Sequence, residues 1–430
     1  MDPARPLADG FLVEEGRIVA LGTDADADVR TAAAVLDFEE RTITPGFIDA
    51  HTHVLHAARQ AERLSLEGVT TLETALERVR AAHARLPDGA WLVGFGQLGL
   101  SFARPPHRRD LDGAAASRAI LLHNRDHHSA WVSSTALERA GVTRATADPE
   151  GGRIGRDPDG SPNGLLFENA VALVVRAIPR PGLDEDVAAL ARTLEAAAEC
   201  GVTCVHDFEG LEAWNACDRL RGEGRLPVRV RLGVPAPDAA SREIAPELPA
   251  RRREDEQLSL FAVKCFLDGA LGSRTAYLLE PYVGSDDRGL ATLSRERLDA
   301  LSQFAIEHDL SIAAHAIGDA AVRLALDAFE SWPAAARARL RPRVEHAQLV
   351  SERDFARFGA LGVVASMQPS HCVTDRPLAR ALWGGRDARG GYAWRQLLEE
   401  GAPLAFGSDA PIEPLDPRFG LWAAVTGGDP

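Results

Sequence analysis

The sequence contains almost no lysine, few cysteines and no long apolar run. Lys264 is the only lysine among 48 basic residues, and the other 47 are arginine. The five cysteines are odd in number and form no CxxC pair, so we expect them to be reduced in a cytoplasmic protein. We expect no signal peptide, and no apolar run approaches the ~20 residues that cross a bilayer. The net charge of −15 argues against nucleic acid or an anionic membrane as a partner.

The surroundings of the single lysine indicate a buried position. Lys264 stands in the apolar run FAVKCFLDG, which is typical of a buried strand. Arginine can replace lysine as a surface charge but not as an amine nucleophile, because guanidinium stays protonated while a buried lysine can lose its proton. A neutral amine can add carbon dioxide and become a carbamate, an anionic ligand able to bridge two metals. The alternative, a leftover surface charge, is disfavoured by the apolar flanks.

Strand-like and helix-like stretches alternate along the chain, which predicts parallel strands joined by crossover helices. A length of 430 residues fits two or three domains, or one α/β barrel with insertions. We expect helices over 71–86, 184–200, 294–308, 319–331 and 351–360. We expect strands over 43–54, 90–95, 119–123, 202–206, 228–233, 260–267, 311–315, 343–346, 362–367 and 403–407, with two further short strands within 11–21. The Arg-, Gly- and Pro-rich region from about 99 to 180 breaks the alternation and is predicted to be an insertion that covers a barrel mouth.

Two histidines follow the first long apolar run, in the sequence PGFIDAHTH. His51 and His53 stand at i and i+2, so on a strand both side chains point to the same face. Imidazole is the commonest side-chain ligand of zinc-type ions. The pair alone is a weak signal, because a histidine on an apolar strand is more often a core residue than a ligand.

Four more candidate ligands each end or follow a strand-like run: Lys264, His315, His346 and Asp409. His315 and His346 are 31 residues apart, about one strand-plus-helix unit, and 63 residues, about two units, separate His346 from Asp409. The 211 residues between His53 and Lys264 leave room for three units and the insertion. The candidates therefore fall on strands 1, 4, 5, 6 and 8 of an eight-stranded barrel, at the strand ends where catalytic groups of that fold sit.

These motifs together resemble the metal-dependent amidohydrolase superfamily, and within it amidohydrolase family 3, which includes N-substituted formamide deformylase. The matching segments are PGFIDAHTH from Pro45, VKCFLDGALGSRTA from Val263, HAIGD from His315, RVEHAQ from Arg343, QPSH from Gln368 and GSDAP from Gly407. The resemblance runs from about residue 5 to 422. It implies an α/β fold, a (β/α)8 TIM barrel spanning 46–430, with a small, incomplete β-sandwich segment over 1–45.

The resemblance also implies a binuclear metal centre. His51 and His53 would hold one ion, His315 and His346 the other, carboxylated Lys264 would bridge them, and Asp409 would complete the first site. Zinc is the expected ion. Metal-bound hydroxide would attack a carbonyl, and Asp409 would pass the proton to the leaving group.

The expected reaction is hydrolysis of a C–N bond in a small amide or N-formyl substrate. An ester, carbamate or lactone hydrolase remains open, as does a non-catalytic truncated homologue. Self-association into a homodimer is also left open. Further site candidates are His371, as a donor to the developing oxyanion, and Asp319, to orient His315. His128, His206, Asp207 and Arg274 are candidates on the substrate side.

We expect the chain to be incomplete at both ends. A sandwich of this family is built from about the first 50 and last 50–80 residues, whereas only 21 residues follow Asp409. The strands within 11–21 would then lack partners, and a two-stranded ribbon is marginally stable alone. Their apolar residues Val13, Ile18 and Leu21 are expected to be exposed.

Overall fold

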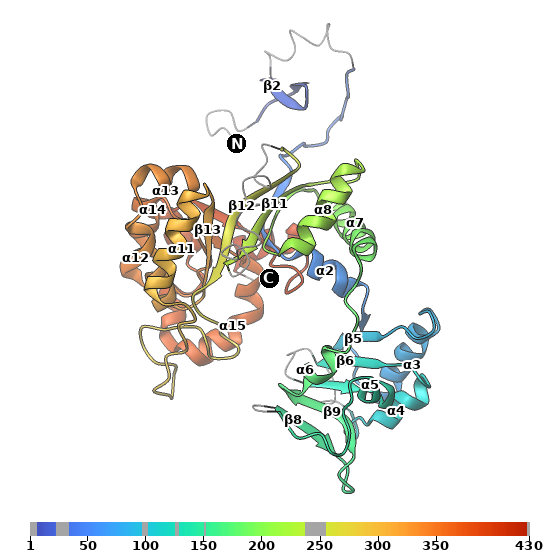
Figure 1. The fold of residues 1–430 in the computed structure, drawn as a ribbon. Coiled ribbons are helices and arrows are strands. Elements are labelled where there is room, and N and C mark those ends of the chain that lie inside the picture. The colour runs from blue at the N-terminus through green and yellow to red at the C-terminus, as the bar shows by residue number, and fades with distance from the viewer. Residues whose placement is uncertain are drawn as a thin grey trace. The chain divides into compact units, whose positions relative to one another are not determined.

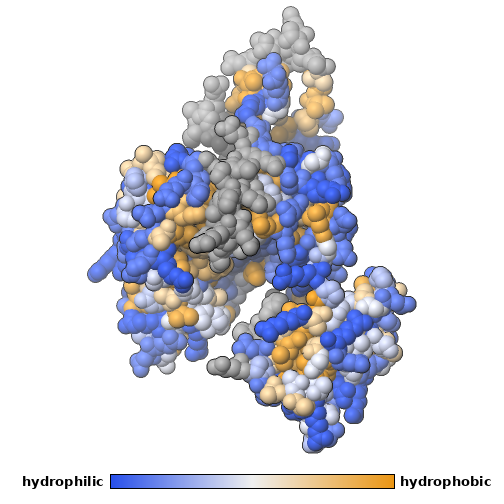
Figure 2. Space-filling view, viewed as in Figure 1, coloured by the Kyte–Doolittle hydropathy of each residue, from blue (hydrophilic) through white to orange (hydrophobic). Residues whose placement is uncertain are grey.

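The computed structural model describes residues 7–22, 34–96, 102–124, 129–149, 152–236 and 255–427 (Figure 1). The chain divides into two compact units, Met1–Phe47 and Ile48–Pro430. In the described part of the first unit, β1 (Phe11–Glu14) and β2 (Arg17–Leu21) pair with each other as an antiparallel two-stranded sheet. As expected, Val13 is 50% and Ile18 62% exposed, and Figure 2 shows hydrophobic atoms at the surface of this hairpin; Leu21 is half-buried.

The second unit contains an eight-stranded parallel sheet that is nearly closed into a barrel. Within this sheet the strands are neighbours in the same order as in the chain. They are β3 (Phe47–Thr52), β10 (Val202–Asp207), β11 (Arg229–Pro235), β12 (Leu258–Phe266), β13 (Ser311–Ala316), β14 (Arg343–His346), β15 (Val364–Met367) and β16 (Leu404–Phe406). The predicted (β/α)8 fold is therefore confirmed. The predicted places of the candidate ligands on strands 1, 4, 5, 6 and 8 also agree with this order.

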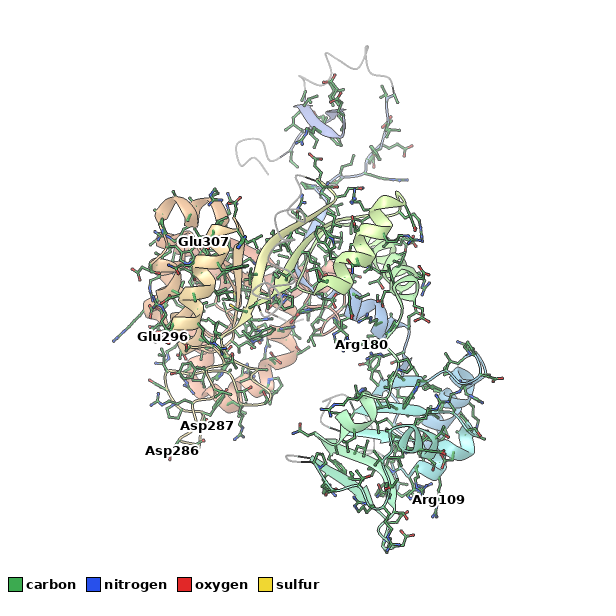
Figure 3. All side chains as sticks on the ribbon, viewed as in Figure 1. Arg109, Arg180, Asp286, Asp287, Glu296 and Glu307 are labelled. Atoms are coloured by element: carbon green, nitrogen blue, oxygen red, sulfur yellow. The ribbon has the colours of Figure 1, made fainter. Side chains whose placement is uncertain are left out.

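Helices lie between the barrel strands and after the last of them, and four of these helices fall on the predicted ranges 184–200, 294–308, 319–331 and 351–360. They are α2 (Val54–Ala61), α7 (Leu183–Glu199), α8 (Leu211–Gly222), α11 (Arg295–Glu307), α12 (Asp319–Glu330), α13 (Ala334–Leu340), α14 (Phe355–Leu361), α15 (Pro369–Trp383), α16 (Asp387–Gly390), α17 (Trp394–Glu399) and α18 (Pro417–Thr426). Figure 3 labels Glu296 and Glu307 at opposite ends of α11, whose Leu298 and Ala305 are buried. Ser294 begins α11 as a side-chain cap, accepting a hydrogen bond from Arg297 N at 3.4 Å.

The first and last barrel strands meet through backbone and side-chain hydrogen bonds. Asp409 N donates to His51 O at 2.7 Å, and His53 N donates to Ala410 O at 2.9 Å. Buried Asp49 accepts the backbone N–H of Ser408 at 2.9 Å, which fixes the loop after β16 to β3. His51 and Asp409, which are 358 positions apart in sequence (409 minus 51), are thus placed side by side.

A second, six-stranded sheet follows α2, with strand order β4 (Leu64–Ser65), β5 (Leu92–Gly96), β6 (Ile120–Asn124), β7 (Ser129–Val132), β9 (Pro162–Glu168) and β8 (Gly152–Arg156). Helices α3 (Leu72–His83), α4 (Arg108–Ala114), α5 (Ser134–Arg139) and α6 (Val171–Val175) complete this region. Two apolar clusters form its core, one around Trp131 and one around Leu166.

The expected start of the insertion, near residue 99, is too late. Strands β5 and β6 belong to the second sheet, so the segment outside the barrel already begins at β4. The sequence misleads here because β5 and β6 are parallel and largely buried, and barrel strands share both features. Whether this segment covers a barrel mouth stays a prediction.

None of the helices in the described part of the chain has the length and apolar character required to span a bilayer. All five cysteines are free, and Cys204, Cys217 and Cys265 are buried.

Candidate metal centre

The candidate ligands gather at the carboxyl ends of the barrel strands. His51 lies at the end of β3, Lys264 in β12, His315 in β13 and His346 at the end of β14, while Asp409 follows β16. Ligand atoms of His51, His53 and Asp409 lie within 4.8 Å of one another, as do those of His346, His371 and Asp409. The ring centroids of His315 and His346 are 4.5 Å apart. The parallel strands therefore bring all the predicted ligands to one rim.

His51 is fixed by a buried carboxylate. Its Nδ1 lies 2.6 Å from Glu345 Oε2, and both side chains are fully buried. An ionised carboxylate only accepts hydrogen bonds, so His51 Nδ1 must carry the proton and Nε2 keeps its lone pair. Burial, and next the charge of Lys264, lower the pKa of His51 well below its usual value, which keeps the ring neutral.

Buried Arg343 in turn holds Glu345. Its Nε and Nη2 donate to the two carboxylate oxygens, with Nη2 lying 3.0 Å from Oε2. The same guanidinium donates to Ala50 O and to Ser366 Oγ, each at 2.6 Å, so it joins strands 1, 6 and 7. Burial would raise the pKa of Glu345, but the charges of Arg343 and Lys264, together with hydrogen bonds from Arg343 and Ser366, outweigh burial and hold this pKa below its usual value.

His315 and His346 show the same arrangement with neutral acceptors. His315 Nε2 lies 3.0 Å from Gly269 O, and a carbonyl only accepts, so Nε2 carries the proton and Nδ1 is unprotonated. His346 Nδ1 lies 2.8 Å from Gln368 Oε1, which leaves its Nε2 as the acceptor. Burial lowers the pKa of His315 to about 4 and that of His346 well below its usual value. Each of three neutral histidines thus has one nitrogen with a free lone pair, as metal ligation requires.

Asp409 is the carboxylate common to both groups of ligands. Its Oδ1 lies 3.5 Å from His51 Nε2 and 3.4 Å from His53 Nε2, and its Oδ2 lies 3.9 Å from His371 Nε2. Burial would raise the pKa of Asp409, but His51 and a hydrogen bond with His53 hold it well below its usual range. The carboxylate is therefore ionised. His371 Nε2 is buried and has no hydrogen-bond partner among the residues that the structure describes, so it is available to a ligand.

Lys264 is 2% exposed, and its Nζ lies 3.4 Å from His51 Nε2. The ammonium also lies over the Phe208 and Phe266 rings, 4.8 and 5.3 Å from their centroids. Burial lowers the pKa of Lys264 from 10.5 to about 8. The amine is thus far easier to deprotonate than an exposed lysine, which is the requirement for carbamate formation.

Residues with strained backbone are also present at this rim. His346, Ala347 and Asp409 have positive φ values of 72°, 41° and 57°. Such conformations are unfavourable for residues other than glycine and persist where the surroundings enforce them, often at functional sites.

The candidates on the substrate side are placed as follows. His128 lies outside the described residues. His206 Nδ1 accepts from Arg343 Nη1 at 2.8 Å, and burial lowers the pKa of His206 to about 3, so this ring supports Arg343. Fully buried Asp207 accepts from Val54 N at 2.9 Å. Arg274 is exposed in the loop between β12 and α11. Roles of these residues toward a substrate stay predictions.

Asp319 does not contact His315, contrary to expectation. Asp319 Oδ1 accepts the N–H of Leu279 at 2.9 Å. The carboxylate beside His315 is Asp268, whose Oδ1 lies 3.7 Å from His315 Nε2 and which accepts backbone N–H groups of Ile317 and Gly318. The correction follows from register, because Asp268 follows the strand paired directly with β13 whereas Asp319 opens α12.

The supporting residues Arg343, Glu345 and Gln368 were given no role from the sequence. A signal was present, since Arg343 and Glu345 are opposite charges at i and i+2 of the predicted strand over 343–346 and therefore face the same side. Buried charges need partners, so such a pair indicates an internal network.

Comparison with known proteins supports a metal centre. The family model described as amidohydrolase family matches residues 34–430. The chain is 32% identical to Protein LONG AFTER FAR-RED 3 of Arabidopsis thaliana over 99% of this chain and 76% of that protein. It is 26% identical to N-substituted formamide deformylase of Arthrobacter pascens over 99% and 81% of the two chains. A solved structure of an uncharacterized metal-dependent hydrolase from Pyrococcus furiosus is 28% identical, with a TM-score of 0.81 over 97% of this chain and 84% of that one.

Proposed function

This chain belongs to the amidohydrolase family and is a hydrolase that uses a divalent metal; from that premise we propose that it cleaves the C–N bond of a small amide or N-formyl substrate. We further propose two zinc ions, with His51, His53 and Asp409 at one, His315 and His346 at the other, and carboxylated Lys264 between them. The similarity to N-substituted formamide deformylase supports the choice of bond.

The protonation pattern of the histidines carries this proposal. Glu345, Gly269 O and Gln368 each fix one histidine nitrogen as the donor, which leaves the opposite nitrogen free to bind an ion. His51 and His346 are buried and His315 is largely so, and a rim built only for stability has no need of three such neutral imidazoles with their lone pairs kept free.

When bound, the ions lower the pKa of a water molecule and polarise the substrate carbonyl. The protein's own part is positioning and proton transfer. Asp409 is ionised and belongs to both ligand groups, so it can accept a proton from the attacking water. As the C–N bond breaks, the same proton passes to the leaving nitrogen, giving one acid and one amine from amide and water. Nε2 of His371, for which the described residues supply no hydrogen-bond partner, can donate to the carbonyl oxygen as negative charge develops on it.

A hydrolysis screen tests this proposal. Zinc-reconstituted protein is assayed with N-formyl amines, N-acyl amines, and matched esters, carbamates and lactones. Higher kcat/KM for the amides than for the matched esters, corrected for their uncatalysed rates, supports the proposal. Preference for esters, carbamates or lactones would reassign the reaction. Absence of turnover with every compound, in protein that retains zinc, would favour a non-catalytic homologue.

A further inference from the structure

Helix α2 begins directly after the candidate ligand His53, which occupies the N-cap position. Ser, Thr, Asp or Asn usually stands there, because its side chain accepts a backbone N–H of the first turn. His53 makes no such bond. Its ring instead directs Nε2 toward Asp409 Oδ1 at 3.4 Å. A ligand at this position therefore leaves the first turn of α2 without a cap of its own.

Two carboxylates at the end of β10 supply the cap instead. Asp207 Oδ1 accepts the N–H of Val54 at 2.9 Å. Glu209 accepts hydrogen bonds from the next two N–H groups, with Oε2 at 2.6 Å from Leu55 N and Oε1 at 2.9 Å from His56 N. All three N–H groups of the first turn are thus held from a segment about 150 positions later in the sequence. The positive end of the helix dipole also favours negative charge here.

The same segment fastens the residues before His53. Phe208 N donates to Thr52 O at 2.9 Å, and Thr52 Oγ1 donates to His206 O at 3.1 Å. The Phe208 ring packs 4.6 Å from the His51 ring. His53 N itself donates to Ala410 O at 2.9 Å. The backbone is therefore fixed on both sides of His53, while its side chain is 27% exposed, so the position of the ring depends largely on the position of this backbone.

We propose that Glu209 is a positioning residue that holds His53 where it can bind the metal, with Asp207 in a supporting role. The inference builds on the proposed metal site. Glu209 takes two of the three N–H groups, so its loss frees most of the first turn of α2. The first turn then frays, and His53 reaches its binding position only in part of the population. Asp207 is less suited to testing, because it is fully buried and its removal also leaves a cavity.

Helix α2 offers a matched control at its other end. Arg59 Nη2 donates to Glu212 Oε2 at 2.8 Å, so Glu212 also contacts α2 but not its first turn. Glu212→Ala removes the same type of side chain, which likewise contacts α2 from outside that helix. The two variants separate positioning of His53 from a general loss of contacts to α2.

The experiment measures zinc affinity by chelator competition, well below the melting temperature, together with activity at rising zinc concentration. Glu209→Ala is expected to bind zinc at least about tenfold more weakly than wild type, the range seen when a residue supporting a metal ligand is lost. Saturating zinc should restore most of its kcat. Glu212→Ala should stay within about twofold of wild type. If Glu209→Ala does not fold, Glu209→Gln takes its place, because its amide offers only one acceptor oxygen.

Affinity in the Glu209 variant equal to that of Glu212→Ala would overturn the inference. So would a kcat that stays low at saturating zinc, since this would mean a role other than placing a ligand. Wild-type protein that binds no zinc would overturn the proposed metal site, and the inference with it. The first two results leave the site proposal standing, so the two failures can be told apart.

Discussion

Replacing Glu345 by Gln changes the proton on His51 without changing the shape of the side chain. In the native protein the carboxylate accepts from His51 Nδ1 at 2.6 Å and from two nitrogens of Arg343. The glutamine amide has only one acceptor oxygen, so it cannot accept from both His51 Nδ1 and Arg343 Nε. With its NH2 group toward His51, it donates to Nδ1, which moves the ring proton to Nε2 and blocks the ligand atom. With its oxygen toward His51, the NH2 group opposes Arg343 Nε, where two donors meet.

The size of the expected loss of zinc affinity and of folding stability follows from the interaction that each orientation of the amide removes. Loss of a residue that orients a metal ligand costs about 10–100-fold in metal affinity, or about 1.4–2.8 kcal/mol. Unpairing buried Arg343 costs about 3–5 kcal/mol of folding stability, a large share of the 5–15 kcal/mol typical of proteins. Glu345→Gln should therefore bind zinc about 10–100-fold more weakly and melt at a lower temperature. Zinc affinity is measured by chelator competition at a temperature where circular dichroism shows a folded variant.

Glu330→Gln is the matched control, because Glu330 Oε2 also pairs with an arginine, Arg357 Nη2 at 2.7 Å, but is exposed. An exposed pair contributes little, so zinc affinity and melting temperature should stay close to wild type. Folded Glu345→Gln with zinc affinity within about threefold of wild type would refute the reasoning that Glu345 fixes the His51 proton.

Three further predictions concern the lysine and the shared carboxylate. Lys264→Arg should lose activity as fully as Lys264→Ala, and added short carboxylic acids should partly restore the activity of the alanine variant only. Near-normal turnover of Lys264→Arg would rule out a carbamate. Carbon dioxide adds only to the unprotonated amine, and burial lowers the pKa of Lys264 to about 8. Carbamate formation by metal-free protein, measured with 13C-bicarbonate, should therefore rise from about pH 6 and level off above that pKa. A rise centred near the ordinary value of 10.5 would contradict this. Asp409→Asn should keep much of its metal but lose at least about 100-fold in kcat, because an amide cannot accept the proton; equal loss of metal content would make Asp409 chiefly a ligand.

Most of the barrel follows from the sequence, because its strands and helices are local patterns of suitable length. The predicted helix over 184–200, for example, corresponds to α7 at Leu183–Glu199. The one-unit spacing of His315 and His346 likewise places them on neighbouring strands. Strands β5 and β6 were predicted as strands, but their sheet was not, because the choice of neighbour is not a local property.

The supporting contacts of the site were less accessible for the same reason. Glu345 contacts His51 across 294 residues of sequence, and Glu209 contacts Leu55 across 154. Periodicity predicts that each of these residues lies on a strand or just after one, but it does not predict which distant residue each will contact. Asp319 illustrates this limit of the sequence, because it is close to His315 in sequence but accepts its hydrogen bond from Leu279 N.

The most direct test of the account is hydrolysis of an N-substituted formamide by one protein preparation in two states, stripped of metal and reconstituted with zinc. We predict that the reconstituted protein releases formate and amine in equal amounts, and that the stripped protein releases neither until zinc is returned. Equal rates in the two states, or no release by reconstituted protein that demonstrably holds zinc, would contradict the proposed function.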